Sequence, residues 1–195
     1  MLEQLTKRRT QYALGRNIGA GEEAIDEWIR EAIRQSPTAF NSQGSRAIIL
    51  FGEQSQAFWE IVRNELKEIL PAEMLEQSLA KVDRFAAGVG TVLFFEDQRT
   101  VHDLQQQWAI FADHFPAWSE QSSGMAQLAV WATLANAGIG ASLQHYNPLI
   151  DVKVQQMWDV PENWKLRAQM PFGSNEAPFN EKSFMPDEMR FRTYR

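Results

Sequence analysis

Short apolar runs alternate with longer amphipathic segments along the whole chain. The runs Ala47–Phe51 and Thr91–Glu96 are rich in β-branched and aromatic residues, as is typical of buried strands. The unbroken apolar character of the first run predicts a strand that is buried on both faces. Ile139–Leu143 and Trp164–Met170 predict a third and a fourth strand.

Helical spacing of apolar residues fills most of the sequence between these runs. In Glu22–Gln35, apolar residues recur every three or four positions and acidic residues crowd the first turn. Pro116 separates two further helical patterns, and Gly138 ends the second of them. The predicted helices are 2–14, 22–35, 54–70, 71–85, 99–114, 118–137 and 152–158. Long helices around about four strands indicate an α+β fold, or an α/β fold with a single sheet layer.

The chain divides at about residue 170. Residues 1–170 hold every predicted helix and strand, so we interpret them as one core domain. Residues 171–195 are polar, contain three prolines and have no hydrophobic period. Such a tail on a compact domain is either disordered or held by something outside the domain, and we expect a partner subunit to hold it.

Composition narrows the possible partners. The 195 residues carry a formal net charge of -6, which disfavours nucleic acid and anionic membranes because both attract a basic surface. With no cysteine, the chain has no disulfide, thiolate nucleophile or cysteine-ligated metal. The N-terminus lacks an apolar signal segment, and the most apolar window, Met125–Leu143, is too short and too interrupted to span a membrane. We therefore expect a cytoplasmic protein that binds small molecules or other proteins.

No familiar catalytic motif stands out. Asn17–Ala24 (NIGAGEEA) imitates a dinucleotide fingerprint, but a helix rather than a strand is predicted before it. The three histidines lack the spacing of metal ligands, so we predict no metal site. Glu96 and Asp97 could act as acid and base, although carboxylates at a strand end usually cap the next helix.

Two polar segments suggest a ligand site. The motif Arg8–Thr10 (RRT) suits a phosphate clamp, because guanidinium groups bind phosphate bidentately and a hydroxyl adds a hydrogen bond. The loop Thr38–Arg46 leads into a predicted strand and carries many side-chain donors and acceptors. Either segment alone could be an ordinary solvated stretch. Together with the strand 139–143 and a lone Lys182, they describe one pocket lined from four distant places.

Five blocks of sequence, in order, resemble the FMN-dependent nitroreductase superfamily. They are RRT near the N-terminus, SPTAFNSQGSR, AGVGTVLFFED, WSEQSSGMAQ and NAGIGASLQHYNP. They look most like the small branch related to the fatty-acid-repression-mutant proteins of yeast and bacteria. The five blocks occur in the same order as in the family, and the resemblance covers nearly the whole chain.

The resemblance implies a nitroreductase-like α+β fold with a central, mainly antiparallel sheet flanked by helices. It also implies a homodimer that binds FMN at its interface, with a C-terminal arm extending onto the partner subunit. The positions that match the family's FMN-binding motifs are Arg8, Arg9, Thr10 and Lys182 for the phosphate and ribityl chain, Thr38, Ala39, Phe40, Asn41 and Gln43 for a loop that approaches the flavin from the neighbouring subunit, and Leu143 and Gln144 for the strand end beside the flavin ring.

Two positions depart from the pattern of larger nitroreductases. Tyr12 stands where the larger nitroreductases have a lysine, and Phe184 stands where they have a second basic residue in the tail. We nevertheless include Tyr12 among the expected cofactor-binding residues. A cation near the pyrimidine end of the flavin stabilises its reduced anion, so we expect another residue to take this role. Lys81 is the first candidate and Arg84 the second.

The implied function is that of an FMN-dependent oxidoreductase that takes hydride from NADH or NADPH and reduces small nitroaromatic or quinone-like acceptors. In such an enzyme the flavin carries the chemistry, so no catalytic side chain is expected. The alternative is a non-catalytic regulatory protein of the same fold that binds flavin or a lipid. A purely structural helical protein is disfavoured by the buried strands and the two arginines.

Overall fold

A computed structural model describes all residues, 1–195, and its centre is a five-stranded antiparallel sheet. The strands run in the order β1-β5-β3-β2, and β4 also pairs with β5. Their bounds are β1 Leu14–Gly15, β2 Ser45–Phe51, β3 Gly90–Asp97, β4 Gly140–Ala141 and β5 Trp164–Asn175. This architecture confirms the α+β prediction and decides it against the α/β alternative, because no two neighbouring strands of the sheet are parallel.

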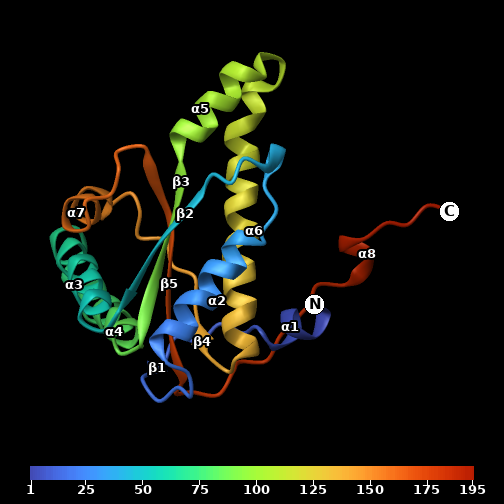
Figure 1. The fold of residues 1–195 in the computed structure, drawn as a ribbon. Helices are drawn as coiled ribbons and strands as arrows, with labels where there is room; N and C mark the ends of the chain where they lie inside the picture. The colour runs from blue at the N-terminus through green and yellow to red at the C-terminus, as the bar shows by residue number, and fades with distance from the viewer.

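Helices cover both faces of the sheet (Figure 1). One layer contains α3 (Gly52–Ile69), α4 (Ala72–Ala86) and α7 (Asp151–Met157), and the other contains α2 (Glu22–Arg34) and α6 (Phe115–Asn136). The remaining elements are α1 (Leu2–Lys7), the 3₁₀ turns η1 (Ala39–Asn41) and η2 (Ala109–His114), α5 (Gln98–Gln107) and α8 (Asp187–Arg190). None of the helices combines the length and the apolar character that crossing a membrane requires.

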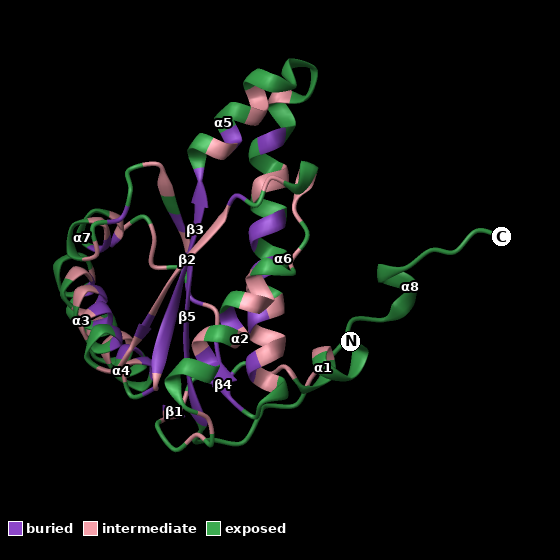
Figure 2. Cartoon of the chain, viewed as in Figure 1, coloured by how far each residue is buried: buried purple, intermediate pink, exposed green.

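The central strand β3 separates two apolar cores. Leu93 and Phe95 pack into the core beneath α3 and α4, whereas Val92 and Phe94 pack into the core beneath α2 and α6. This alternation follows from the two-residue period of a strand, whose side chains point to opposite faces in turn. All eight residues of β3 are buried, which accounts for the unbroken apolar run Val92–Phe95 at its centre (Figure 2).

Strand β2 lies at the edge of the sheet, and the prediction that both of its faces are covered is confirmed. Both faces do pack on helices: Ile48 and Leu50 contact one core, and Ala47, Ile49 and Phe51 contact the other. Only Leu50 is fully buried, because no strand pairs with the outer edge of β2. An apolar run indicates that both faces of a strand are covered. It does not indicate whether a second strand pairs with each edge of that strand.

The first helix is shorter than the predicted 2–14, because α1 ends at Lys7. Beyond it the chain is extended, and the Gln11 N–H donates to the carbonyl of Ala141 at 2.9 Å. Thr10 forms a parallel bridge with the same residue. Pairing with β4 therefore outweighs the helical pattern and places the RRT motif on an extended segment.

The fourth strand is longer than the predicted Trp164–Met170, because β5 continues to Asn175. The carbonyl of Pro171 accepts a hydrogen bond from Ser142 N–H, on the β4 side of β5. In a strand the nitrogen and the carbonyl of one residue point to the same side, so the nitrogen of Pro171 also faces away from β3. The missing N–H of the proline consequently leaves the ladder with β3 intact. Beyond Glu176 the tail first runs to α1, and its last part, with α8, leads away from the body of the molecule (Figure 1).

We predict that Thr91→Val destabilises the fold by about 1–3 kcal/mol, because Thr91 Oγ1 accepts from the buried Trp59 indole and bonds with Ser55 Oγ, both at 2.8 Å. Urea unfolding followed by circular dichroism measures this change. In a Trp59→Phe background, which has no indole N–H, the same substitution should cost less. Equal costs in the two backgrounds would contradict this explanation.

Candidate functional site

Four cationic side chains line a cavity of about 430 Å³ near the N-terminus. They are Arg8, Arg9, Arg84 and Lys182, and none of them forms a salt bridge within the chain. No carboxylate lines the cavity; its other lining residues are Thr10, Gln11, Tyr12, Ala13, Ala177, Pro178 and Asn180. Four unneutralised cations around one space favour binding of a polyvalent anion, such as a phosphate ester.

Three separate parts of the chain bring these cations together. The arginines of the RRT motif come from the extended segment beside β4, and Arg84 comes from the last turn of α4. Lys182 comes from the tail, where its Nζ lies 3.4 Å from the carbonyl of Thr6. The tail is tethered because Gln11 Nε2 donates to the carbonyl of Ala177 at 2.7 Å. The phosphate clamp suggested by two arginines is thus extended by two distant cations.

Arg8, which lines this cavity, also stacks on an aromatic ring. Its guanidinium carbon lies 4.3 Å from the centre of the Trp131 ring, which belongs to α6. Burial, and to a lesser extent the charge of Arg9, lowers the pKa of Arg8 below its ordinary value. Burial therefore makes the charge of Arg8 less favourable than it would be in water, and a bound anion would offset that cost.

The predicted polar loop, Thr38–Arg46, does not line the cationic cavity. Thr38, Ala39 and Phe40 line a second cavity of about 450 Å³, together with Pro37, Trp118, Gln121, Ser122 and Met125. Phe40 packs against four aromatic rings, those of Trp108, Phe111, Phe115 and Trp118. Asn41 and Gln43 lie at the turn that follows, and the Gln43 N–H donates to Thr38 Oγ1 at 3.0 Å.

The two groups of predicted residues are far apart within one chain. Arg8 contacts Trp131 near the C-terminal end of α6, and Phe40 contacts Trp118 near its N-terminal end. At a rise of about 1.5 Å per residue, these two contacts are roughly 20 Å apart along the helix. Figure 1 shows the same separation, with η1 and α1 beside opposite halves of α6. A single chain therefore does not assemble the whole predicted pocket.

The strand end at Leu143 presents a free backbone donor. The flanking N–H groups of Ser142 and Gln144 donate to the carbonyls of Pro171 and Gln169 on β5, so the intervening Leu143 N–H points to the opposite side. It makes no hydrogen bond within the chain. A ligand beside this strand end could accept that hydrogen bond.

The family follows from comparison with known proteins. The sequence model described as the nitroreductase family matches residues 5–174. The chain belongs to the nitroreductase family. HBN1 and the nitroreductase FRM2, both from Saccharomyces cerevisiae, are 35% and 32% identical to it over 191 and 186 residues. The alignments cover 96% of this chain and 94% of HBN1, and 94% of this chain and 92% of FRM2, which confirms the fatty-acid-repression-mutant branch.

Solved structures agree with this assignment. The nitroreductase CinD from Lactococcus lactis, in complex with nicotinic acid, is 53% identical and superimposes with a TM-score of 0.93 over 100% of this chain and 99% of CinD. Other CinD structures contain chloramphenicol or 4-nitrophenol. A protein from Desulfovibrio desulfuricans in complex with FMN has a TM-score of 0.69 at 14% identity over 99% of this chain and 96% of its own, and it shows a common fold.

Some residues of this nitroreductase occupy positions that the sequence did not predict. Lys81 does not line the cationic cavity; its Nζ lies 5.3 Å from the centre of the Tyr12 ring, and Arg84 lines the cavity instead. These two residues lie one helical turn apart, so spacing alone could not rank them. Trp131 was not predicted either, because a tryptophan in an apolar helix has the same pattern as a core residue.

The acidic pair at the end of β3 has two different roles in this nitroreductase. Asp97 caps α5 by accepting from the Arg99 N–H at 3.0 Å, as carboxylates at a strand end usually do. Glu96 is buried, accepts from Ser119 Oγ at 3.0 Å, and has its pKa raised by burial and by nearby Glu120. No cluster of three or more histidine and acidic side chains is placed to hold a metal ion.

We predict that inorganic phosphate binds this nitroreductase and raises its melting temperature at constant ionic strength. Arg8→Gln and Arg84→Gln should each weaken that binding about tenfold or more, because a hydrogen bond to a charged group contributes about 1.5–3 kcal/mol. Lys153→Gln is the control, since Lys153 pairs with Glu65 between α7 and α3 and does not line the cavity. If all three variants respond to phosphate like the wild type, the cavity is not an anion site.

Proposed function

We propose that this nitroreductase is an FMN-dependent oxidoreductase that takes hydride from NADH or NADPH and reduces nitroaromatic or quinone-like acceptors. The observation that carries this proposal is the cationic cavity free of carboxylates, within a fold whose family members reduce nitro compounds. Its donor set fits the phosphate end of FMN, because four cations and the hydroxyl of Thr10 surround one space. The CinD complexes with nitro compounds support acceptors of this class.

Each predicted residue has a binding or orienting role in this proposal. Arg8, Arg9 and Lys182 hold the phosphate with Arg84, and Thr10 adds a hydroxyl donor toward the ribityl chain. The Leu143 N–H, which is free within the chain, donates to the flavin ring beside Gln144. Tyr12 lines the cavity and Lys81 lies beside Tyr12, where the charge of Lys81 would favour an anionic reduced ring.

The protein contributes binding and electrostatics rather than a nucleophile. The chemistry that FMN supplies when bound is hydride acceptance from the reduced nicotinamide and electron transfer to the acceptor. The chain has no cysteine, and none of its histidines lines either cavity described above. Tuning of the ring by hydrogen bonds and nearby charge is therefore the contribution that these residues can make.

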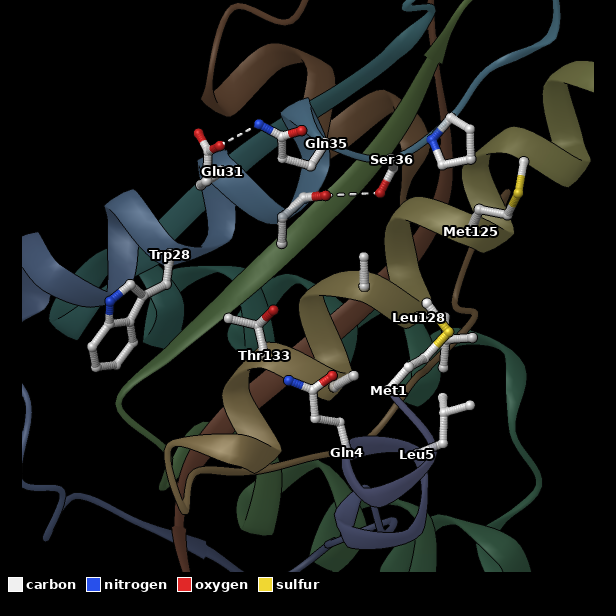
Figure 3. Close-up of a pocket in the computed structure, with 14 residues that line it drawn as sticks. Met1, Gln4, Leu5, Trp28, Glu31, Gln35, Ser36, Met125, Leu128 and Thr133 are labelled. Carbon is white, nitrogen blue, oxygen red and sulfur yellow. Dashed lines mark hydrogen bonds between the residues drawn. The ribbon is translucent and has the colours of Figure 1, made fainter.

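The proposal includes a homodimer. An apolar cavity of about 570 Å³ opens between α1, α2 and α6, with Leu5, Trp28, Met125 and Leu128 in its lining (Figure 3). The tail beyond it exposes further large apolar residues, which are Phe179, Phe184, Met185, Met189, Phe191 and Tyr194 (Figure 2). A second subunit that covers this face and receives the arm would bury both surfaces.

The dimer also accounts for the separation of the predicted pocket into two halves. The loop Thr38–Gln43 is roughly 20 Å along α6 from the cations of its own chain. We infer that it completes the flavin site of the partner subunit instead. The acidic, cysteine-free composition suits a cytoplasmic enzyme.

We predict that the purified protein is yellow, or becomes so on adding FMN, and oxidises NADH or NADPH when a nitroaromatic or quinone is supplied. Replacing both Arg8 and Arg9 by alanine should weaken FMN binding by about 3–6 kcal/mol, from two charge-assisted hydrogen-bonding groups. Absorbance titration measures the affinity. Absence of flavin binding by the wild type would contradict the proposal, and flavin binding without turnover would favour the regulatory alternative.

We predict that two inactive variants restore each other in a mixed dimer. One carries Arg8→Ala with Arg9→Ala, and the other carries Asn41→Ala with Gln43→Ala. If the loop serves the partner, a mixed dimer has one site with all four substitutions and one wild-type site, so activity returns. Co-expression with two affinity tags isolates the mixed dimer, and the two parental homodimers are the controls. No recovery would show that loop and cations act in the same subunit.

A further inference from the structure

The end of the polar loop is held by a guanidinium group. Arg46, the second residue of β2, donates through Nη2 to Asp97 Oδ2 at 2.8 Å. Through Nη1 it donates to the carbonyl of Gln43 at 2.6 Å and to that of Ser45 at 3.1 Å. One side chain thus connects a carboxylate on β3 to the backbone where the loop ends.

The carboxylate of that pair is itself firmly placed. Asp97 is 8% exposed and accepts from Asn163 Nδ2 at 2.5 Å and from Thr100 Oγ1 at 3.1 Å, in addition to capping α5. Its own N–H donates to the carbonyl of Gly44 at 3.0 Å. Burial by itself would raise the pKa of Asp97, but these hydrogen bonds outweigh it and lower the pKa, so the group stays charged.

The loop needs such an anchor because its backbone is unfavourable. Phe40, Asn41 and Gln43 have φ angles of 56°, 50° and 50°, in the left-handed region that residues with a Cβ seldom adopt. Conformations of this kind persist only where the surroundings enforce them. At the start of the loop, Ala39 N–H lies 3.4 Å from Ser122 Oγ and the Phe40 ring packs among four other aromatic rings.

We propose that Arg46 is a positioning residue for the flavin site. Paired with Asp97, it holds the Gln43 carbonyl and thereby maintains the left-handed turn Phe40–Gln43 in the shape that completes the pocket. This inference rests on the proposed function, in which that turn approaches the flavin ring. Neither Arg46 nor Asp97 lines the cationic cavity or the cavity at the loop, so both act through the backbone.

The geometry requires an arginine rather than any cation. A guanidinium group is a planar fork whose two terminal nitrogens can serve two acceptors at once, whereas an ammonium group is a single point of charge. Lysine at this position could reach Asp97 or the Gln43 carbonyl, but not hold both in the same way. Arg46→Lys should therefore fall between the wild type and Arg46→Met.

The test uses two flavins to separate the ring from the phosphate. Arg46→Met should weaken binding of FMN and of riboflavin by the same factor, about tenfold, which corresponds to about 1.4 kcal/mol. Arg8→Ala with Arg9→Ala should weaken FMN binding and leave riboflavin binding unchanged, because riboflavin lacks the phosphate. Arg63→Met is the matched control, since Arg63 is similarly exposed and pairs with Glu60 and Asp83 in the helical layer α3 and α4.

A second measurement does not depend on flavin. Hydrogen exchange of the apoprotein should be faster in Arg46→Met at the amides of Asn41, Ser42 and Gln43, each of which is hydrogen-bonded within the loop. Arg63→Met should leave these amides unchanged. If the wild type binds no flavin but the amides respond, the proposed function fails while the anchoring role of Arg46 stands.

Two results would overturn the proposal. One is wild-type flavin affinity and wild-type loop exchange in Arg46→Met. The other is loss of FMN binding alone with riboflavin binding preserved, which would assign Arg46 to the phosphate end. If Arg46→Met does not fold, Arg46→Lys is measured in its place, and unchanged flavin affinity in that variant contradicts the inference equally.

Discussion

The pairing of β3 with β5 is the constraint on which the rest of the structure depends. Both strands lie inside the sheet, and β3 is buried along its entire length between two helical layers. At one end of this pair, β5 carries β4 and thus the extended RRT segment. At the other end, β3 finishes at Asp97, which anchors the polar loop through Arg46. The two segments of the proposed ligand site are thus attached to opposite ends of the same ladder.

Electrostatics distinguishes one of these ends. The protein as a whole is acidic, with a net charge of -6, yet four cations surround one cavity without an acidic partner. Grouping like charges destabilises a folded chain unless a ligand neutralises them. Burial, and to a lesser extent the neighbouring charge of Arg9, lowers the pKa of Arg8. A resident phosphate ester would therefore contribute to stability as well as to function.

The other end is governed by backbone strain and aromatic packing. Three residues with left-handed φ angles follow one another closely, and both flanks of the turn are fastened to rigid elements. Strained loops of this kind are common where a protein presents backbone groups to a ligand. This loop is far from the cations of its own chain, and α1, α6 and the tail expose apolar surfaces. The proposed dimer would place the loop beside the cations of the partner subunit and cover those surfaces.

By itself the sequence determined the composition of the cores and suggested the chemistry of the proposed ligand site. The period of the apolar residues located α2, α3, α4 and β3 to within one or two residues, because burial leaves a regular trace in the sequence. The RRT motif was identified from its side chains alone. Only the tertiary structure decided that this motif is extended, that β2 is an edge strand, and that Arg84 and Trp131 join Arg8. Those facts depend on which segments pair across long stretches of chain, and such pairing leaves no periodic signal in any one segment.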